Sequence, residues 1–381
     1  MVRYKIHWDP RILLPCILLF HLCTTAMSQT DEVVGDVDTL FVRDLSHLLT
    51  GRVYTSTKYN AIRIGDLQGE QLIYRPTNQY NIGLGASYRK FTLNLGVGIP
   101  YLTYVNRERL GRSRYLDAQA NIFGADQATN LFLQFWKGYR LTGTHAGSAG
   151  PTGEEGNDAF RDDIEQANFG ISTLRVLNSK RFSYRAPMFH DAWQKRSQGS
   201  WLLGGHLTYY RLRADSALIP MTRQADFSRG AAMRKADLVD IGPMGGYTAT
   251  IVVDRRFYLV GSLAIGAGAG FQYREFTSRT YGENGSSGTS WAPVLRAQLR
   301  GGIGYNHRRS QIALSFNHEH IHHMLPSDGM IAWSVGNIRF NIVHRFDLPI
   351  RSLDRLFVRL RPRTHPIIHE AIPAIKEAEV Q

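Results

Sequence analysis

Cysteine and long apolar runs are what this sequence has least of. Of its 381 residues only two are cysteines, Cys16 and Cys23, and both lie within the first 28 residues. No later segment contains 18 consecutive apolar residues, which excludes ordinary transmembrane helices after the N-terminal region. Without cysteine, the remaining chain can form neither a disulfide nor a thiolate metal site.

Charge is also scarce. Charged residues make up 20% of the chain, against 43% hydrophobic residues and 36 glycines, so the composition is not that of a disordered protein. The formal net charge is +13, but the basic residues are scattered along the sequence rather than gathered in one patch. We therefore expect no nucleic-acid partner.

The N-terminus has the three parts of an export signal. Three basic residues accompany an apolar stretch at 12–22 ("ILLPCILLFHL"), and small residues at 26 and 28 precede the expected cleavage after Ser28. An uncleaved membrane anchor is the alternative, but this stretch, interrupted by Pro15, falls short of the roughly 20 residues that a spanning helix needs. Lipidation of Cys23 is not expected because Leu22, rather than a small residue, precedes it. We expect export through a cleaved signal peptide, residues 1–28.

Most of the chain after residue 50 alternates apolar with small or polar residues. The pattern is clear at 81–99 ("NIGLGASYRKFTLNLGVGI") and again over 257–273. A soluble sandwich or barrel would turn the apolar face inward, whereas an outer-membrane barrel would turn it outward against lipid. The opposite face here carries Gly, Ser, Thr and Asn rather than Lys and Glu, and the strands are longer than the usual mode of about 5–6 residues. The sequence therefore predicts a barrel in the bacterial outer membrane.

The predicted fold class is all-β, a transmembrane antiparallel up-and-down β-barrel. Alternation marks thirteen segments, yet a bacterial barrel has an even strand number because both ends lie in the periplasm. We expect about twelve strands, within a range of ten to fourteen, with the wrong segment between residues 180 and 237. The segments are 51–65, 70–88, 91–104, 113–123, 129–141, 167–177, 180–188, 199–213, 238–251, 256–275, 289–306, 310–322 and 330–346.

Turns and aromatic residues support the same arrangement. We expect short periplasmic turns at 89–90, 178–179, 254–255 and 307–309, and extracellular loops at 142–166 and 276–288. Tyrosines near the expected strand ends are typical of the aromatic belts at membrane interfaces. They are Tyr88, Tyr101, Tyr104, Tyr139, Tyr209, Tyr210 and Tyr273.

The chain divides into four expected parts. They are the signal peptide at 1–28, a periplasmic segment at 29–49 with a short helix at 40–49, the barrel at 50–346, and a Pro- and Arg-containing periplasmic tail at 347–381. The last strand closes on an aromatic residue, Phe346, which is the type of signal that barrel-assembly machinery recognises. Expected partners are therefore that machinery during biogenesis, and outer-membrane lipids and lipopolysaccharide. The basic tail is expected to be solvated, with attraction to anionic lipid as the alternative.

Three segments carry a family resemblance: "LIYRPTNQYNIGLGASYRKFTLNLGVGIP", "KRFSYRAPMFHDAWQKRSQGSWLLGG" and "DSALIP". They resemble domain-of-unknown-function family 4421, whose members are exported proteins predicted to be outer-membrane barrels. The resemblance covers about residues 50–346, and its most specific part is 182–200. It implies a fold and a location, but no activity, catalytic residue or cofactor.

Residues 317–324 ("NHEHIHHM") contain four histidines, and imidazole is the commonest transition-metal ligand. On the expected strand, His318, His320 and His322 continue the lipid-facing parity, while His323 points inward. Same-face neighbours lie about 6.6–7 Å apart, too far for three imidazoles to reach one ion at about 2.0–2.1 Å. We expect a rim of histidines just above the hydrocarbon, with a surface metal site completed by residues 324–329 as the alternative. No metal or cofactor is expected.

Two serine–histidine pairs were considered as catalytic groups. Ser315 and His318 have opposite parity, and Ser200 and His206 lie about 20 Å apart along a strand, so neither makes a nucleophile–base pair. The "GAGAG" run at 266–270 lacks the Lys-Ser/Thr of a phosphate loop and fits small lumen-facing residues between closely packed strands. We expect no catalytic residues and no enzyme activity.

Two functions remain from the sequence. One is a narrow pore or transport barrel for a small molecule of unknown identity, and the other is a non-conducting structural or partner-binding barrel. Arg274, Arg339 and Arg345 have lumen parity and would favour anions if water fills the interior. Pairing of these arginines with lumen acids is the alternative.

Overall fold

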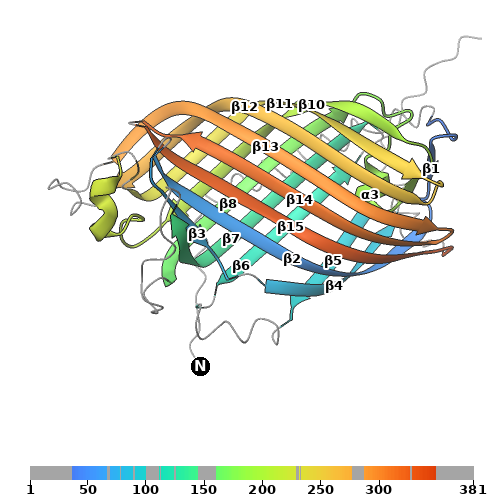
Figure 1. Ribbon diagram of the computed structural model, residues 1–381, viewed down its shortest axis with the longest axis horizontal. Helices are drawn as coiled ribbons and strands as arrows, with labels where there is room; N and C mark the ends of the chain where they lie inside the picture. The colour runs from blue at the N-terminus through green and yellow to red at the C-terminus, as the bar shows by residue number, and fades with distance from the viewer. Residues whose placement is uncertain are drawn as a thin grey trace, which may run out of the picture. The chain divides into compact units, whose positions relative to one another are not determined.

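The period-two pattern forms long strands in the computed structural model, which describes residues 37–66, 69–77, 79–88, 91–99, 111, 113–123, 126–144, 160–228, 231, 233–276, 287–326 and 328–348. Ten strands form a closed antiparallel ring, in which β15 returns to pair with β2 (Figure 1). In ring order these are β2 (Leu49–Asp66), β3 (Gln71–Arg75), β7 (Gln127–Thr144), β8 (Phe160–Val176), β10 (Gln198–Arg213), β11 (Met233–Val253), β12 (Phe257–Phe276), β13 (Ser287–His307), β14 (Ser310–Met324) and β15 (Gly329–Phe346). The predicted all-β antiparallel barrel is confirmed. The signal peptide and the tail lie outside the described residues.

The ring has ten strands, which is the lower limit of the predicted range of ten to fourteen and two fewer than the twelve expected. The predicted strand at 70–88 divides into β3, which pairs with β7, and β4 (Gln79–Tyr88), which pairs with β2 and with β5 (Phe91–Gly98). Among the described residues, β6 (Arg114–Phe123) pairs only with β7. Because β3 joins β2 directly to β7, the strands β4, β5 and β6 lie off the closed ring.

The two ends of the ring differ in their connections. At the short-turn end, residues 254–256 join β11 to β12 and residues 308–309 join β13 to β14, as the sequence predicts. β2 begins and β15 ends at this same end. At the opposite, long-loop end, the three long connections are residues 145–159, 214–232 and 277–286, and the two short ones are 67–70 and 325–328. The predicted turn at 89–90 lies outside the described residues.

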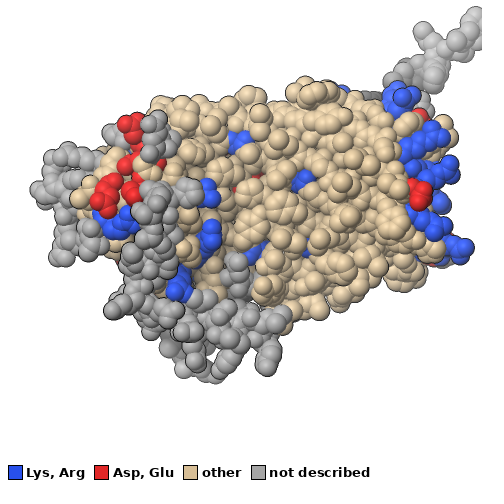
Figure 2. Space-filling view, in the orientation of Figure 1, with Lys and Arg blue, Asp and Glu red and all other residues tan. Residues whose placement is uncertain are grey.

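Apolar side chains point away from the ring, and polar ones point into it. On β12, Leu259, Leu263 and Ile265 are 53%, 51% and 62% exposed, whereas Ser262 and Gln272, of opposite parity, are buried. Figure 2 shows the middle of the barrel almost free of charged residues on this face. No helix in the described part of the chain has the length and apolarity needed to cross a membrane.

The connection between β8 and β10, residues 177–197, begins with a turn that includes the predicted turn at 178–179, but the predicted strand does not follow it. It contains a short helix, α3 (Arg185–Phe189), and a short strand, β9 (Ala192–Gln194), and we call it the plug segment. The predicted strand at 180–188 is therefore wrong, and it lies in the region where strand parity failed. Pro187 explains why no strand forms there, because proline lacks the backbone donor that an interior strand requires.

The predicted helix at 40–49 is also wrong. Residues Val42–Asp44 form β1, which pairs with β9. Asp38 accepts the backbone N–H of Leu40 at 3.0 Å, and Asp44 accepts that of Ser46 at 2.9 Å. Such local side-chain bonds favour turns over helix.

Candidate functional site: the barrel interior

The plug segment fills the interior at the short-turn end. Phe182 and Tyr184 pack in a cluster with Leu174, Leu202 and Met244, which project inward from three strands of the wall. The Tyr184 hydroxyl lies 3.1 Å from the hydroxyl of Ser262, and the guanidinium of Arg300 lies over the Tyr184 ring at 5.5 Å. The plug segment thus contacts five consecutive strands of the wall, β8, β10, β11, β12 and β13.

Arg345 joins the plug segment to the last strand. Its side chain is completely buried, and its Nε donates a hydrogen bond of 2.8 Å to the carbonyl oxygen of His190. Its Nη2 donates to Oε1 of Gln311 at 2.5 Å. Burial, with the guanidinium groups of Arg52 and Arg345 nearby, holds the pKa of His190 well below its ordinary value. His190 is therefore neutral at neutral pH.

A polar layer lies in the middle of the interior. Nε2 of His206 is 3.1 Å from one carboxylate oxygen of Asp240, and Nε2 of His323 is 3.9 Å from the other. These three side chains come from β10, β11 and β14, and all are buried. Beside them, Arg296 forms a buried ion pair with Glu319. Arg296 and Glu319 carry opposite charges, and Asp240 lies between two imidazoles, so this layer does not present a uniform charge.

Apolar side chains fill the interior at the long-loop end. Trp333, Tyr210 and Tyr139 are at most 1% exposed and belong to one apolar cluster. Leu218 and Ile219, which precede the short helix η3 (Met221–Asp226), belong to the same cluster and close it from outside. The interior is closed at this end by packed side chains.

Two predicted belt tyrosines therefore belong to the core. Tyr139 and Tyr210 are interior, whereas Tyr209 and Tyr273 share the parity of exposed exterior residues. Tyr88 is buried as well, and Tyr101 and Tyr104 lie outside the described residues. A position near a strand end does not show whether a tyrosine points into the barrel or away from it, since adjacent residues such as 209 and 210 point in opposite directions.

Neither serine–histidine pair forms a catalytic arrangement. Ser200 donates its hydroxyl hydrogen to the carbonyl of Trp201 at 2.9 Å, while His206 faces Asp240. Ser315 is turned inward and His318 outward. Among the described residues, no three His, Cys, Asp or Glu side chains are arranged to hold a metal ion.

The three lumen-parity arginines lie in the interior, as expected. Arg274 and Arg345 are buried, and the guanidinium of Arg274 lies over the ring of Phe276 at 5.4 Å. That of Arg339 lies over the ring of Tyr54 at 4.5 Å. These contacts hold the guanidinium groups against aromatic faces. Sequence reasoning did not find Arg296, whose neighbours come from other strands and so give no local signal.

His318, His320 and His322 face outward, as predicted, and we call them the histidine stripe. Their Cα partners on β13 are residues 299, 297 and 295. Leu299 and Leu295 are exposed members of the apolar exterior, so the stripe lies within that exterior rather than above its edge. The alternation along one strand predicts whether these side chains point inward or outward. Their position along the barrel, relative to the apolar exterior, depends on pairing with the neighbouring strand.

Two polar neighbours hold the histidine stripe. Nδ1 of His318 lies 2.9 Å from the hydroxyl of Tyr59, and Nδ1 of His320 lies 2.7 Å from the hydroxyl of Ser334. His318 thus has a polar neighbour from β2 and His320 one from β15, and consecutive rings of the stripe lie 6.5 Å and 6.3 Å apart. This spacing does not converge on one ion.

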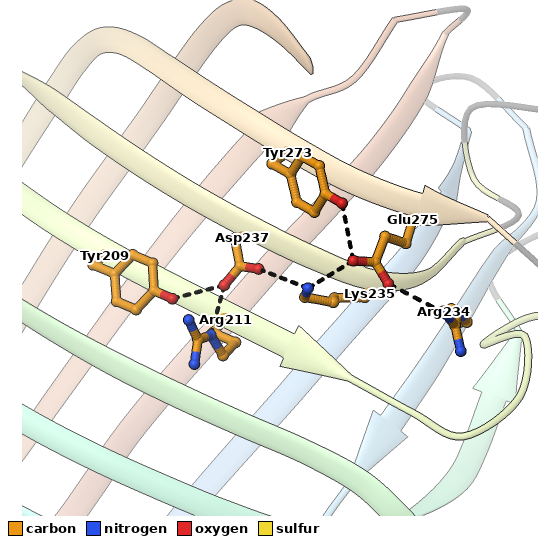
Figure 3. A network of polar contacts seen from close by, with 7 residues as sticks. All are labelled: Tyr209, Arg211, Arg234, Lys235, Asp237, Tyr273 and Glu275. Carbon is orange, nitrogen blue, oxygen red and sulfur yellow. Dashed lines mark hydrogen bonds and ion pairs between the residues drawn. The ribbon is translucent and has the colours of Figure 1, made fainter. Parts of the chain in front are cut away.

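A second polar feature lies on the exterior of β10, β11 and β12 near the long-loop end (Figure 3). Asp237 accepts hydrogen bonds of 2.6 Å from both Tyr209 and Arg211, and Glu275 accepts one of 2.7 Å from Lys235. Lys235 also lies 3.7 Å from Asp237, which links the two acids. The network comprises Tyr209, Arg211, Arg234, Lys235, Asp237, Tyr273 and Glu275. Tyrosines combined with charged groups fit the edge of an apolar band.

Comparison with protein families gives one decisive match. The model described as "Domain of unknown function (DUF4421)" matches residues 36–346. The chain belongs to this family. The family match includes β1, the plug segment and the whole ring, so the plug segment is part of what the family model describes.

Solved structures resemble the chain only distantly. A bacterial polysaccharide outer membrane secretin is 11% identical, with 80% of this chain and 100% of that chain covered and a TM-score of 0.31. The translocator domain of the autotransporter NalP from Neisseria meningitidis is 8% identical, with 90% and 100% covered and a TM-score of 0.26. The Pseudomonas putida toluene transporter TodX is 8% identical, with 79% and 90% covered and a TM-score of 0.25. Likeness at this level does not bear on function, and the comparison with curated proteins produced no match.

Proposed function

We propose that this protein is a bacterial outer-membrane barrel that does not conduct in the described conformation and has a structural or partner-binding role. The closure of the interior at both ends carries the proposal. The plug segment occupies the short-turn end, and the cluster around Trp333 occupies the long-loop end. A solute would have to displace both, together with the ion pair of Arg296 and Glu319 between them.

Three properties of the exterior support membrane insertion. Exposed leucine and isoleucine side chains surround strands that have polar interior faces, which is the reverse of a soluble barrel. Exposed aromatic pairs lie toward both ends, with Phe271–Trp291 ring centroids 5.4 Å apart and Phe257–Tyr305 centroids 4.7 Å apart. The ring is closed, so no strand of it has a free edge in lipid. Export by a cleaved signal peptide, insertion by barrel-assembly machinery, contact with lipopolysaccharide and absence of enzyme activity belong to the same proposal.

A narrow pore is the second candidate. One observation favours it: the plug segment is a single connection between neighbouring strands, so it can leave the interior without opening the ring. Its connection to β15 through Arg345 would then be the contact that must break.

The test is in two stages. The mature protein should fractionate with outer membranes and migrate faster on a denaturing gel unheated than boiled, and recovery as a soluble periplasmic protein would refute the barrel proposal. In planar bilayers we expect no steady current from the wild type. Arg345→Ala is the informative variant, and Arg309→Ala, an exposed arginine at the same end, is its control. Current from the wild type would contradict the first candidate, and current from Arg345→Ala alone would favour a gated pore.

A further inference from the structure

The two tight turns at the short-turn end contain arginine where turn geometry favours other residues. Arg255 has φ 57° and Arg308 has φ 44°, both in the left-handed region. Short hairpin turns place residues such as Asn, Asp and Gly at positive φ, because these adopt this conformation more easily than arginine. Backbone geometry therefore does not explain either arginine, and a residue kept in an unfavourable conformation points to a role for its side chain.

These arginines belong to a larger basic surface. Figure 2 shows basic side chains gathered at the end of the barrel where β1 lies, with few acidic ones. The basic residues there are Arg43, Lys180, Arg181, Lys195, Arg196, Arg255, Arg256, Arg308 and Arg309, and the exposed or partly exposed acids are Asp38, Asp44, Asp254 and Asp347. Arg255 and Arg308 are exposed and, within the described ranges, neither forms an ion pair. We call the nine basic residues the arginine ring.

A shallow recess lies where the arginine ring meets the apolar exterior. It has a volume of about 590 Å³ and is lined by Asp254, Arg256, Phe257 and Tyr305. Arg256 Nη1 lies 3.5 Å from the Tyr305 hydroxyl, and Phe257 is 53% exposed. The recess thus combines a cation, a hydrogen-bond acceptor and two aromatic rings at the edge of an apolar band.

We propose that the arginine ring binds the headgroups of anionic phospholipid, with the recess as one seat for a phosphatidylglycerol headgroup. Arg256 would bind the phosphate, Asp254 would accept hydrogen bonds from the glycerol hydroxyls, and the aromatic rings would lie against the acyl chain. Clustered cations next to a membrane attract anionic lipid, and guanidinium groups pair well with phosphate. This inference rests on the proposed membrane insertion.

Charge complementarity argues against the nearest alternative occupant. β15 ends at Phe346 at this same end, and the chain that follows carries arginines at 351, 355, 359, 361 and 363. The stretch 351–363, which carries these five arginines and one acid, Asp354, would be repelled by the arginine ring, so an anionic ligand from outside the chain fits better than this stretch. An acidic protein would also be attracted, but it would not need the aromatic recess beside the apolar surface.

The test uses the full mature chain inserted into bilayers of phosphatidylcholine, phosphatidylethanolamine and phosphatidylglycerol. Lipids that stay bound to the barrel are counted by native mass spectrometry. The variant Arg255→Gly with Arg308→Gly removes two charges and should keep the fold, because glycine adopts both turn conformations freely. The control, Arg213→Gln with Arg234→Gln, removes the same charge from the long-loop end.

We expect the wild type and the control to retain phosphatidylglycerol preferentially, and the turn variant to lose roughly fivefold in that preference per arginine removed. Equal loss in the control, no preference in the wild type, or a preference for phosphatidylethanolamine would overturn the proposal. So would displacement of the bound lipid by millimolar inorganic phosphate, or capture of an acidic protein with no lipid preference. A chain that fails to insert at all refutes the proposed function itself, whereas insertion without lipid preference refutes only this inference.

Discussion

Gly268 offers a sharp test of how closely β11 and β12 approach each other. A Cβ added at Gly268 would lie against the Ile241 carbonyl oxygen, 2.9 Å from the Ile241 carbonyl carbon and 3.1 Å from Cα of Gly242. All three atoms are backbone atoms of the neighbouring strand, so no side chain can rotate away. Gly261 is also in β12, but a Cβ there has no atom within 4 Å. The two glycines therefore form a matched pair on one strand.

The expected effects have opposite signs. Gly268→Ala forces two paired strands apart, and overpacking of this kind costs about 1–3 kcal/mol. Gly261→Ala adds a methyl group in open space and reduces the freedom of the unfolded chain, which stabilises by about 0.5–1 kcal/mol. The difference between the variants should thus be roughly 1.5–4 kcal/mol in the free energy of unfolding.

Equilibrium urea unfolding of the refolded protein in lipid vesicles, followed by tryptophan fluorescence, measures this difference. Reversibility is checked by refolding from the unfolded side, because a free energy is defined only if both directions agree. Equal stability of Gly268→Ala and Gly261→Ala would refute the close approach of β11 and β12. It would also refute the explanation of the glycine-rich run as a packing feature.

Three further predictions concern other parts of the barrel. Because the pKa of His190 is well below the ordinary value of about 6.5, the wild type should lose stability relative to His190→Gln as the pH falls below about 6.5, whereas the difference between the two proteins should be constant above it; parallel stability–pH curves over the whole range would contradict this. Deletion of 347–381 should leave insertion largely intact, while Phe346→Ala should impair it, as membrane fractionation will show, and the reverse order would mean that the tail directs assembly. Replacing all three residues of the histidine stripe with tyrosine should change stability by less than about 1 kcal/mol, and calorimetric titration with zinc should detect no micromolar binding in either protein.

The alternation of the sequence was sufficient to predict the barrel wall. Each strand exposes one face, so residues such as Leu263 and Ser262 could be assigned outward and inward from period two alone. Parity also located an error between residues 180 and 237. The interior could not be predicted in this way, because Asp240 meets His206 and His323 only through the register of three different strands.

The plug segment was missed for a more specific reason. Phe182, Tyr184 and Ala186 alternate with polar residues just as a strand would. Phe182 and Tyr184 are buried against the wall, and Ala186 is buried against Val42 of β1 and Ala192 of β9. Pro187 in the sequence argues against a strand. The concentration of family-specific residues at 182–200 indicates a distinct element. Neither signal indicates that the segment turns into the interior, because that depends on the space left by the surrounding wall.

The seam between β2 and β15 has a consequence for the time course of assembly. It pairs Leu49 with Phe346 and Asp66 with Gly329, so the ring closes only when nearly the whole chain is present. Contacts between residues so distant in sequence form slowly, because a very long loop must close first. Until then β2 and β15 each present an unpaired edge that invites pairing with another chain. Nascent copies should therefore need protection from one another until the last strand arrives.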